Sequence, residues 1–343
     1  RIHANHVWER RMKRPIAYIA GTGHAVPKNI MTNADIAAMG LETNDEWIID
    51  RTGIKQRHIA RDGETLTSLS AEASRMAMAR AGVQPGEIDV IILGTATPDH
   101  LLPATAVEIQ TALGCTRAAA FDISAACSGW LYAAIMGESL IASGSADTVL
   151  VIGAEMLSTI VDWTDRNTCI LFADGAGATV LRRNKERGGT KGILSSFMRS
   201  DGALAELLWR PAGGAAEPFS PEVFEQKRHC VRMAGREVFK HAVRSMAEAT
   251  DRALDSARLT AADVDLLIPH QANVRIIEAT AKHAGISMEK VFINVDRFGN
   301  TSAASIPIAL SDAVEQGRVK EGTTVMFVAF GAGFTWGSLV ARF

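Results

Sequence analysis

Two alanine-rich stretches, SLSAEASRMAMARAG at residues 68–82 and RSMAEATDRALDSAR at residues 244–258, share one pattern. Ala71 matches Ala247, a shift of 176 positions (247 − 71), and the alanines and glutamate around them match at the same shift. The same shift pairs GEIDVIILG with ADVDLLIPH, and ADTVLVIGAE with GTTVMFVAFG. Alanine-rich helices resemble one another by composition alone, but composition does not explain why the strand segments match at the same shift. The chain therefore reads as an internal duplication.

The repeated unit alternates strands and helices. Its strands are continuous apolar runs, which is typical of sheets buried on both faces. We therefore expect an α/β fold with layers of helix and sheet and a pseudo-twofold axis. The expected parts are a flexible leader at 1–11 before a natural start at Met12, an N-terminal half at 12–185 and a C-terminal half at 186–343.

Composition excludes several classes of function. The net charge is −2 and 22% of residues are charged, so the basic excess of a nucleic-acid-binding protein is missing. The apolar runs have the length of strands and fall short of the roughly 18–20 residues that span a bilayer. Four scattered cysteines and nine histidines form no CxxC or HExxH spacing, so we expect no metal site and no disulfide framework. A reducing cytoplasm fits this cysteine usage best.

FDISAACSGW, at residues 121–130, places a cysteine among small residues after an apolar run. We predict a short buried strand at 118–123 and a helix at 124–141, with Cys127 in the first turn of the helix. Free N–H groups and the helix dipole favour a thiolate at such a place. A free cysteine is also a common buried hydrophobe, which is the alternative interpretation. Under the 176-residue shift Cys127 corresponds to Ala303, so the two segments are expected to face one another near the pseudo-axis.

The second half supplies polar residues at places where ligands bind. LLIPHQAN puts His270 at the carboxyl end of a buried strand, although a satisfied structural histidine is common there. RFGNTSAAS puts Asn300 at or near a helix N-cap, and capping alone would account for it. FGAGFTWGS gives a glycine turn whose amides could bind an oxyanion, or a plain turn into the last strand. Cysteine, histidine, asparagine and such a turn together favour thioester or acyl chemistry.

With these residues in view, the sequence from Met12 to Phe343 resembles the β-ketoacyl-acyl-carrier-protein synthase III family, which condenses a starter in type II fatty acid synthesis. The motifs that carry the resemblance are GTGHAVP, TNDEWIIDRTGI, FDISAACSGW, DWTDRNT, LFADGAGA, IPHQAN, RFGNTSAAS and FGAGFTWGS. The resemblance implies a thiolase-like fold in an α-β-α-β-α arrangement. It also implies a homodimer without a cofactor, in which acyl-CoA and malonyl-acyl-carrier-protein are the substrates.

The resemblance assigns roles to the polar residues. Cys127 looks like the nucleophile that takes the acyl group, and His270 and Asn300 look like the pair that binds the malonyl thioester and its enolate. The oxyanion hole would be formed by the N–H groups of Cys127 and Ala332. Alanine stands there in place of a glycine common in the family, which an N–H donor tolerates if φ is negative.

The resemblance also implies residues that bind CoA, the acyl group and the carrier protein. Trp47 and Arg166 would stack on the adenine of CoA, or Trp47 would only pack. Leu102 would reach the acyl pocket of the other subunit and, being smaller than the Phe of acetyl-specific members, would admit somewhat longer or branched starters; plain interface packing is the alternative. The positions implied by function are Trp47, Arg51, Arg166 and Asn273 for CoA, Leu102 and Phe172 for the acyl pocket, and Lys240, Arg275 and Lys282 for the carrier protein, unless these cations are simply solvated.

Single residues distinguish this family from enzymes with related functions. Thiolases carry a second cysteine where this chain has Ala332, and elongating synthases a second histidine where it has Asn300. Papain-like peptidases carry a C-G-[SA]-C-[WY] signature, which AACSGW does not match. A non-catalytic member would be expected to lose Cys127, His270 or Asn300. A starter or acyltransfer enzyme of secondary metabolism stays open, because the sequence does not fix the starter or the pathway.

Overall fold

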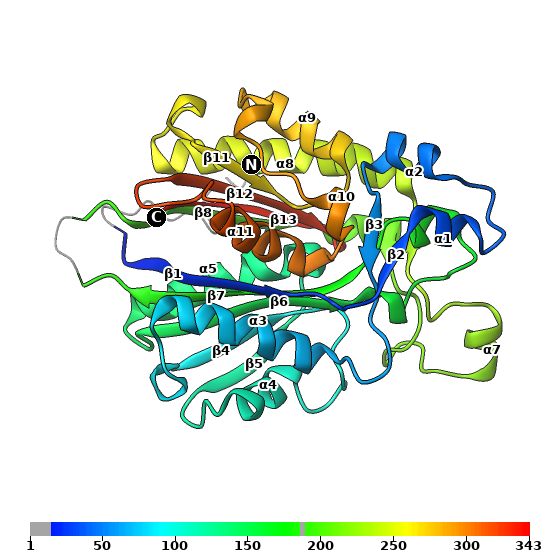
Figure 1. The fold of residues 1–343 in the computed structure, drawn as a ribbon, viewed down its shortest axis with the longest axis horizontal. Coiled ribbons are helices and arrows are strands. Elements are labelled where there is room, and N and C mark those ends of the chain that lie inside the picture. The colour runs from blue at the N-terminus through cyan, green and yellow to red at the C-terminus, as the bar shows by residue number, and fades with distance from the viewer. Residues whose placement is uncertain (1–14, 186–188) are drawn as a thin grey trace, which may run out of the picture.

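The computed structural model describes residues 15–185 and 189–343, so the predicted leader at 1–11 lies outside the described residues. Two twisted sheets form the body of the molecule (Figure 1). In spatial order the five strands of the first are β1 (Ala17–Ala25), β7 (Asp174–Arg183), β6 (Thr148–Met156), β4 (Val90–Gly94) and β5 (Ala119–Ile123). The four strands of the second are β11 (Leu266–Pro269), β12 (Thr324–Gly331), β13 (Thr335–Arg342) and β8 (Gly192–Ser200).

Helices form three layers around the two sheets, and Figure 1 shows the α-β-α-β-α stack edge-on. The middle layer consists of α5 (Gly129–Ser143) and α11 (Ser305–Glu315), whose apolar side chains join both sheets in one core. The outer layers are α3 (Leu66–Ala81) and α4 (Thr105–Leu113) on the first sheet, and α8 (Gly235–Ala257) and α9 (Val274–Ala284) on the second. This confirms the expected layered α/β fold.

The duplication is visible in the register of the sheets. Val90 of β4 pairs with Val149 of β6, and 176 residues later Leu266 of β11 pairs with Val325 of β12, both in parallel. Two helices also end at equivalent positions. The C-cap of α3 is Gly82 and that of α8 is its equivalent Arg258, and both have a left-handed φ (63° and 57°). The shift found in the sequence is therefore a structural symmetry.

The segment around Cys127 differs from the predicted strand and helix in two ways. β5 begins at Ala119 and is only half-buried, because it is the edge strand of its sheet. The α-helix begins at Gly129, and Cys127 lies before it in the 3-10 turn η2 (Ala126–Ser128). Ala126 has φ 46°, a left-handed conformation that an α-helix cannot continue through. The predicted helix start at residue 124 was therefore five residues too early, and Cys127 precedes the first helical turn instead of lying in it.

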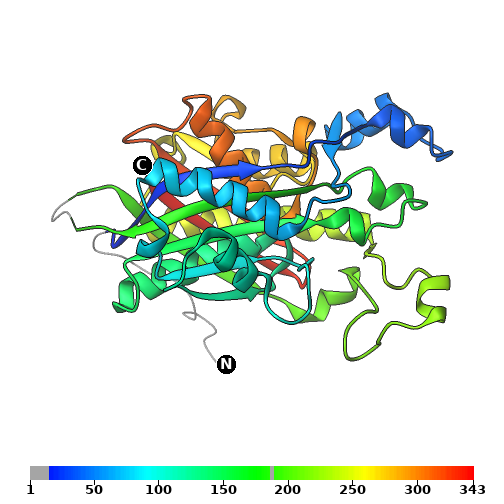
Figure 2. The ribbon, with the colours of Figure 1, turned by 60° about the horizontal axis from the view of Figure 1, so that its bottom comes forward.

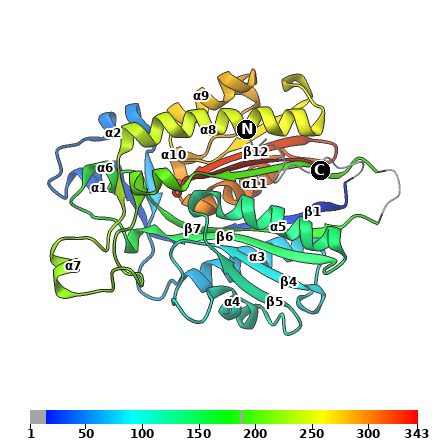
Figure 3. The ribbon, with the colours of Figure 1, turned by 180° about the vertical axis from the view of Figure 1, so that it is seen from behind.

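Shorter elements gather at one end of the layered body, which Figures 2 and 3 show from two other sides. They include α1 and α2 from the first half, and α7 on a long loop of the second. Their bounds are β2 (Ile30–Thr32), α1 (Asn33–Ala37), α2 (Asp45–Thr52), β3 (Gln56–His58), α6 (Arg166–Cys169), β9 (Leu208–Trp209), α7 (Pro221–Glu225), β10 (Arg232–Met233) and α10 (Val295–Phe298).

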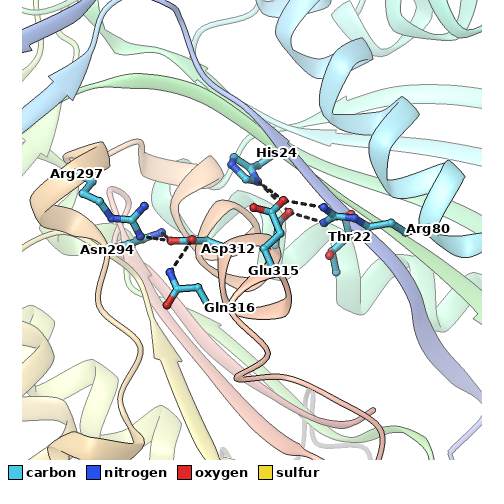
Figure 4. A network of polar contacts seen from close by, with 9 residues as sticks. Thr22, His24, Arg80, Asn294, Arg297, Asp312, Glu315 and Gln316 are labelled. Atoms are coloured by element: carbon cyan, nitrogen blue, oxygen red, sulfur yellow. Dashed lines mark hydrogen bonds and ion pairs between the residues drawn. The ribbon is translucent and has the colours of Figure 1, made fainter.

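A polar network joins α11 of the second half to β1 and α3 of the first (Figure 4). Nδ1 of His24 lies 2.9 Å from Oγ of Ser311, and Arg80 binds Oε1 of Glu315 at 2.7 Å. Burial lowers the pKa of His24, which keeps the ring neutral beside these groups. The network fixes the middle helix of one half on the outer helix of the other.

In the part of the chain that the structure describes, none of the helices combines the length and the apolar character that crossing a membrane requires.

Candidate functional site

A cavity of about 110 Å³ lies where the two halves meet. Cys127 of the first half lines it together with His270 and Asn300 of the second. The other walls are mostly apolar, and include Phe172 and Phe239. Apolar walls of this kind suit the acyl group of a substrate. The structure thus brings together the three residues that the sequence singled out for catalysis.

Symmetry explains how Cys127 reaches the cavity. The turn η2 contacts its equivalent η7 (Ser302–Ala304), as the sequence predicted. Burial raises the pKa of Cys127 to about 12, and the neighbouring carboxylate of Glu155 raises it further, while a hydrogen bond with Ser302 acts the other way. Desolvation thus works against the thiolate that the sequence was expected to favour, and the hydrogen bonds work for it.

His270 follows β11 directly, at the strand end where the sequence placed it. Its Nδ1 lies 2.6 Å from Oγ of Ser305, and this oxygen also accepts the N–H of Gln271 at 3.3 Å. The neutral ring carries one proton, and a Ser305 hydroxyl that donates to Nδ1 leaves that proton on Nε2. Burial lowers the pKa of His270 to about 3. The ring is therefore a neutral hydrogen-bond donor at ordinary pH.

Asn300 is oriented by backbone contacts on both sides of the symmetry axis. Its N–H donates to the carbonyl of Leu171 at 2.9 Å, and its carbonyl accepts from Ala173 at 2.9 Å. Its side-chain Oδ1 accepts the N–H of Ser302 at 2.9 Å. This last hydrogen bond closes the local turn expected near a helix start. It also fixes the side-chain amide, so that Nδ2 is the group left to donate a hydrogen bond.

The glycine loop lies against the nucleophile. β12 ends at Gly331 and β13 begins at Thr335, so Ala332 stands in the tight turn between them. A Cβ at Gly331 would come within 2.6 Å of the backbone nitrogen of Cys127. Only glycine permits this close approach, so the turn that holds Ala332 begins directly beside the backbone of Cys127.

The buried ring of His270 makes folding depend on pH. The pKa in the folded state, about 3, is below the value of 6.5 for an exposed histidine, so this contribution is complete above pH 6.5 and is lost as the pH falls toward 3. Between pH 7 and 4.5 the loss is on the order of 2–3 kcal/mol. In His270→Asn we expect the drop in unfolding free energy between these pH values, measured with urea, to be smaller by that amount. An equal drop in the two proteins would contradict it.

The residues predicted for CoA binding lie together on the surface. The guanidinium groups of Arg51 and Arg166 lie 4.4 and 4.7 Å from the centroid of the Trp47 ring. At that distance Arg166 leaves no space for a second ring, so an adenine between it and Trp47 would require Arg166 to move. The side chain of Asn273 caps α9 through the N–H of Arg275 and donates to the carbonyl of Arg51 at 2.9 Å. Asn273 thereby joins the CoA-binding residues to the wall of the cavity.

The three predicted carrier-protein residues lie on two helices that pack against each other, α8 and α9. The Lys240 side chain is 75% exposed and only 4.0 Å from Glu237. Arg275 binds the carboxylate of Asp50 at 3.0 Å, and Lys282 is in the last turn of α9. This ion pair links α9 to α2, the helix that carries Trp47 and Arg51.

The two predicted acyl-pocket residues differ in their placement. Phe172 is buried in the cavity wall. Leu102 is 89% exposed on the loop before α4, next to Leu101 at 82%, and lies outside the cavity of its own subunit. A role for Leu102 in an acyl pocket therefore requires a second subunit.

Sequence reasoning missed two residues beside the nucleophile. Glu155 at the end of β6 is fully buried, and Oγ of Ser302 donates to its Oε1 at 3.0 Å. A carboxylate at the carboxyl end of an apolar strand was the available signal. For residues 15–185 and 189–343, the structure holds no cluster of three or more His, Cys, Asp or Glu side chains suited to a metal ion.

The chain is similar to known proteins over nearly its whole length. Residues 121–202 match the family described as 3-oxoacyl-[acyl-carrier-protein (ACP)] synthase III, and residues 254–343 match the C-terminal part of that family. The β-ketoacyl-[acyl-carrier-protein] synthase III of Symbiobacterium thermophilum is 52% identical over 329 residues, covering 96% of this chain and 98% of that protein.

Solved structures agree with the sequence relatives. The 3-oxoacyl-[acyl-carrier-protein] synthase III of Aquifex aeolicus superimposes with a TM-score of 0.87 at 46% identity, over 95% of this chain and 100% of the other. The priming β-ketosynthase of the R1128 polyketide pathway gives 0.87 at 32% identity, over 97% and 98%. The cysteine, histidine and asparagine of the cavity thus stand in a chain that belongs to the β-ketoacyl-[acyl-carrier-protein] synthase III family.

Proposed function

We propose that this protein condenses an acyl-CoA starter with malonyl-acyl-carrier-protein, giving 3-oxoacyl-carrier-protein, CoA and CO2 at the start of fatty acid synthesis. The observation that carries the proposal is the cavity in which Cys127 meets His270 and Asn300 from the opposite half. These groups match the two half-reactions of a decarboxylative condensation. The family membership supports the same substrates.

In the first half-reaction the sulfur of Cys127 attacks the thioester carbon of acyl-CoA. The N–H groups of Cys127 and Ala332 hold the oxyanion, CoA leaves with the thiol proton, and the acyl group stays on the cysteine. Trp47, Arg51 and Arg166 form the entrance for CoA by stacking and charge, after Arg166 has moved off the ring.

In the second half-reaction malonyl-carrier-protein takes the place of CoA. Nε2–H of His270 and Nδ2–H of Asn300 donate to the thioester oxygen, so that the bond to the carboxylate breaks and the electrons collect in an enolate. The enolate carbon attacks the acyl group, and the sulfur of Cys127 leaves and regains a proton. Neutral donors serve here because they stabilise the enolate without protonating its carbon.

We further propose a cytoplasmic homodimer that binds the acidic carrier protein through Lys240, Arg275 and Lys282. β5 is an edge strand with β4 as its only neighbour in the sheet among the described strands, and such an edge is a site for pairing with another chain. Leu101 and Leu102 are exposed on the loop before α4, the helix that precedes β5 in the chain. All four cysteines are free thiols, in keeping with a reducing compartment.

The experiment that tests the function is measurement of intact mass after incubation with a panel of acyl-CoAs. The adduct on Cys127 identifies the preferred starter, and addition of malonyl-carrier-protein should remove it and release 3-oxoacyl-carrier-protein. A persistent adduct with no product would contradict the proposal. A starter enzyme of polyketide synthesis is the second candidate, because a priming β-ketosynthase is 32% identical; formation of product only with a polyketide carrier protein would favour it.

Leu102 is proposed to control the length of the starter across the dimer. Replacing it with phenylalanine is expected to lower kcat/KM for butyryl-CoA relative to acetyl-CoA by about 10–200-fold, the range of discrimination in apolar pockets. The matched control is Leu101→Phe, which adds the same ring to the neighbouring exposed position. If both variants keep the ratio of the wild type and remain dimeric, Leu102 is not the gate.

A further inference from the structure

Arg57 is a wholly buried cation in the middle of β3. Nη1 of its guanidinium donates to Oδ1 of Asn33 at 2.8 Å and to the carbonyl of Met31 at 3.3 Å, and Nη2 donates to the carbonyl of Ile170 at 2.7 Å. Burial lowers the pKa of Arg57 to about 10, so the group stays charged at neutral pH. Among the described residues, its hydrogen-bond partners are neutral oxygen atoms. Losing one of them would leave a buried charge short of a partner, which is costly, so these contacts hold together.

The contact made by Nη2 of Arg57 leads to Asn300. Ile170 is the C-cap of α6, and the carbonyl of the next residue, Leu171, accepts the N–H of Asn300 at 2.9 Å. The carbonyl of Asn300 accepts the N–H of Ala173 at 2.9 Å. Both backbone groups of Asn300 are therefore bound to one short segment, and Arg57 holds the end of that segment.

The backbone before Asn300 also packs on Arg57. Gly299 has φ 67°, and a Cβ there would come within 3.1 Å of the Cβ of Arg57. The helix α10, which ends just before Gly299, lies beside β3 (Figure 1). Next to Arg57 in the chain, the N–H of Lys55 donates to the carbonyl of Asp296 in this helix at 3.0 Å. Arg57 and its strand thus support Asn300 from a second side.

The contact made by Nη1 of Arg57 leads to the residues predicted to bind CoA. Asn33 is buried, and its amide oxygen faces the guanidinium because arginine can only donate. Its Nδ2 is therefore turned the other way and donates to Oδ1 of Asp45 at 2.8 Å. Asp45 is the first residue of α2, the helix that carries Trp47 and Arg51. One guanidinium thus joins the start of α2 to the segment that binds Asn300.

We propose that Arg57 is a positioning residue that fixes Asn300 and α2 relative to one another. It touches no substrate and acts through its contacts with Ile170 and Asn33. The role rests on the proposed function, in which Asn300 donates to the malonyl thioester and α2 forms part of the entrance for CoA. Small displacements matter at such a site, because a misplacement of about 1 Å can slow a reaction by about 10²-fold.

A purely electrostatic role for Arg57 predicts a different outcome. A buried positive charge would favour the enolate through its field alone, and a lysine at this position would keep that charge. Lysine ends in a single ammonium group in place of a planar fork, so it cannot bind the oxygens of Asn33 and Ile170 as arginine does. Arg57→Lys therefore removes the positioning and retains the charge.

The experiment measures CO2 release from malonyl-carrier-protein and the KM for acyl-CoA. In Arg57→Lys we expect CO2 release to slow by about 10-fold to 10²-fold, the scale of a misplaced group. The KM should rise by about 3–10-fold, the range that one lost hydrogen bond produces. In Asn33→Ala only the KM should rise, because the contact between Arg57 and Ile170 remains. Added to Asn300→Ala, Arg57→Lys should cause no further loss of CO2 release, because both act in one path.

Hydrogen exchange tests the same contacts without a substrate. In Arg57→Lys we expect peptides that span residues 170–173 and 296–302 to lose protection relative to the wild type. Ile91→Ala is the control for a general loss of stability, since it opens a cavity in the core between the first sheet and its outer helices. It should keep the wild-type CO2 release and KM, and should protect both peptides better than Arg57→Lys does.

The proposal is overturned if Arg57→Lys releases CO2 as fast as the wild type, or if its loss multiplies with that of Asn300→Ala in the double variant. If Arg57→Lys does not fold, Asn33→Ala decides, and an unchanged KM for acyl-CoA then rejects the role of Arg57. A wild type that releases no CO2 would reject the proposed function. The exchange comparison would then decide about Arg57 on its own, and equal protection in Arg57→Lys and the wild type would overturn the proposal.

Discussion

Replacing Cys127 with alanine is expected to abolish both the acyl-enzyme and the condensation, the largest effect of any single substitution considered. No other thiol can take its place. Cys115, Cys169 and Cys230 are buried at other places in the fold, and none of them lines the cavity. The measurement is intact mass after incubation with acyl-CoA, together with formation of 3-oxoacyl-carrier-protein on addition of malonyl-carrier-protein.

The other cysteines supply the controls for this prediction. Alanine in place of Cys115, Cys169 or Cys230 is expected to leave the acyl-enzyme largely intact, and any loss should follow the loss of stability from removing a buried side chain. An adduct that survives in Cys127→Ala, or one that maps to another cysteine in the wild type, would contradict the assignment. Decarboxylation of malonyl-carrier-protein without condensation should persist in Cys127→Ala, because its donors come from the other half.

The architecture could be predicted because the sequence contains two copies of the same pattern of strands and helices. One shift of 176 residues aligned helices and strands, and the same shift relates Val90 and Leu266 in the two sheets. Apolar runs indicated sheets covered on both faces, which the three helical layers provide. Residue-level boundaries were less accessible: the start of α5 at Gly129 depends on the left-handed φ of Ala126, and alanine gives no sign of that conformation.

The core of the site was predictable for a similar reason. Cys127, His270 and Asn300 each stand at an element boundary that the sequence marks, and the symmetry brings those boundaries to one axis. The ionisation of Cys127 was not predictable, because it depends on how completely the opposite half covers the thiol. Glu155 and Ser302 were missed because their contact joins residues 147 positions apart. The stacking of Arg166 on Trp47 likewise depends on tertiary contacts.

The two halves therefore divide the chemistry between them. The first half supplies Cys127 and the buried acid Glu155, and the second half supplies His270, Asn300 and Ser302. In the proposed function, acyl transfer and decarboxylation use different groups around one cavity. Substitutions on the second half should separate the two steps, and His270 and Asn300 are the positions where this can be measured.

His270→Ala and Asn300→Ala are each expected to slow decarboxylation of malonyl-carrier-protein by about 10²–10³-fold, the usual cost of one lost donor to an oxyanion. Acylation of Cys127 should change much less, because in the proposed function the oxyanion of that step is held by backbone N–H groups. The two rates are measured separately, as CO2 release and as acyl-enzyme mass. Conservative His270→Gln is a matched variant, since a side-chain amide can still donate in place of Nε2–H, and it should recover part of the decarboxylation. If either alanine variant lost acylation and kept decarboxylation, the donors would belong to the first half-reaction, and the division of roles between the two halves would be the reverse of the one proposed.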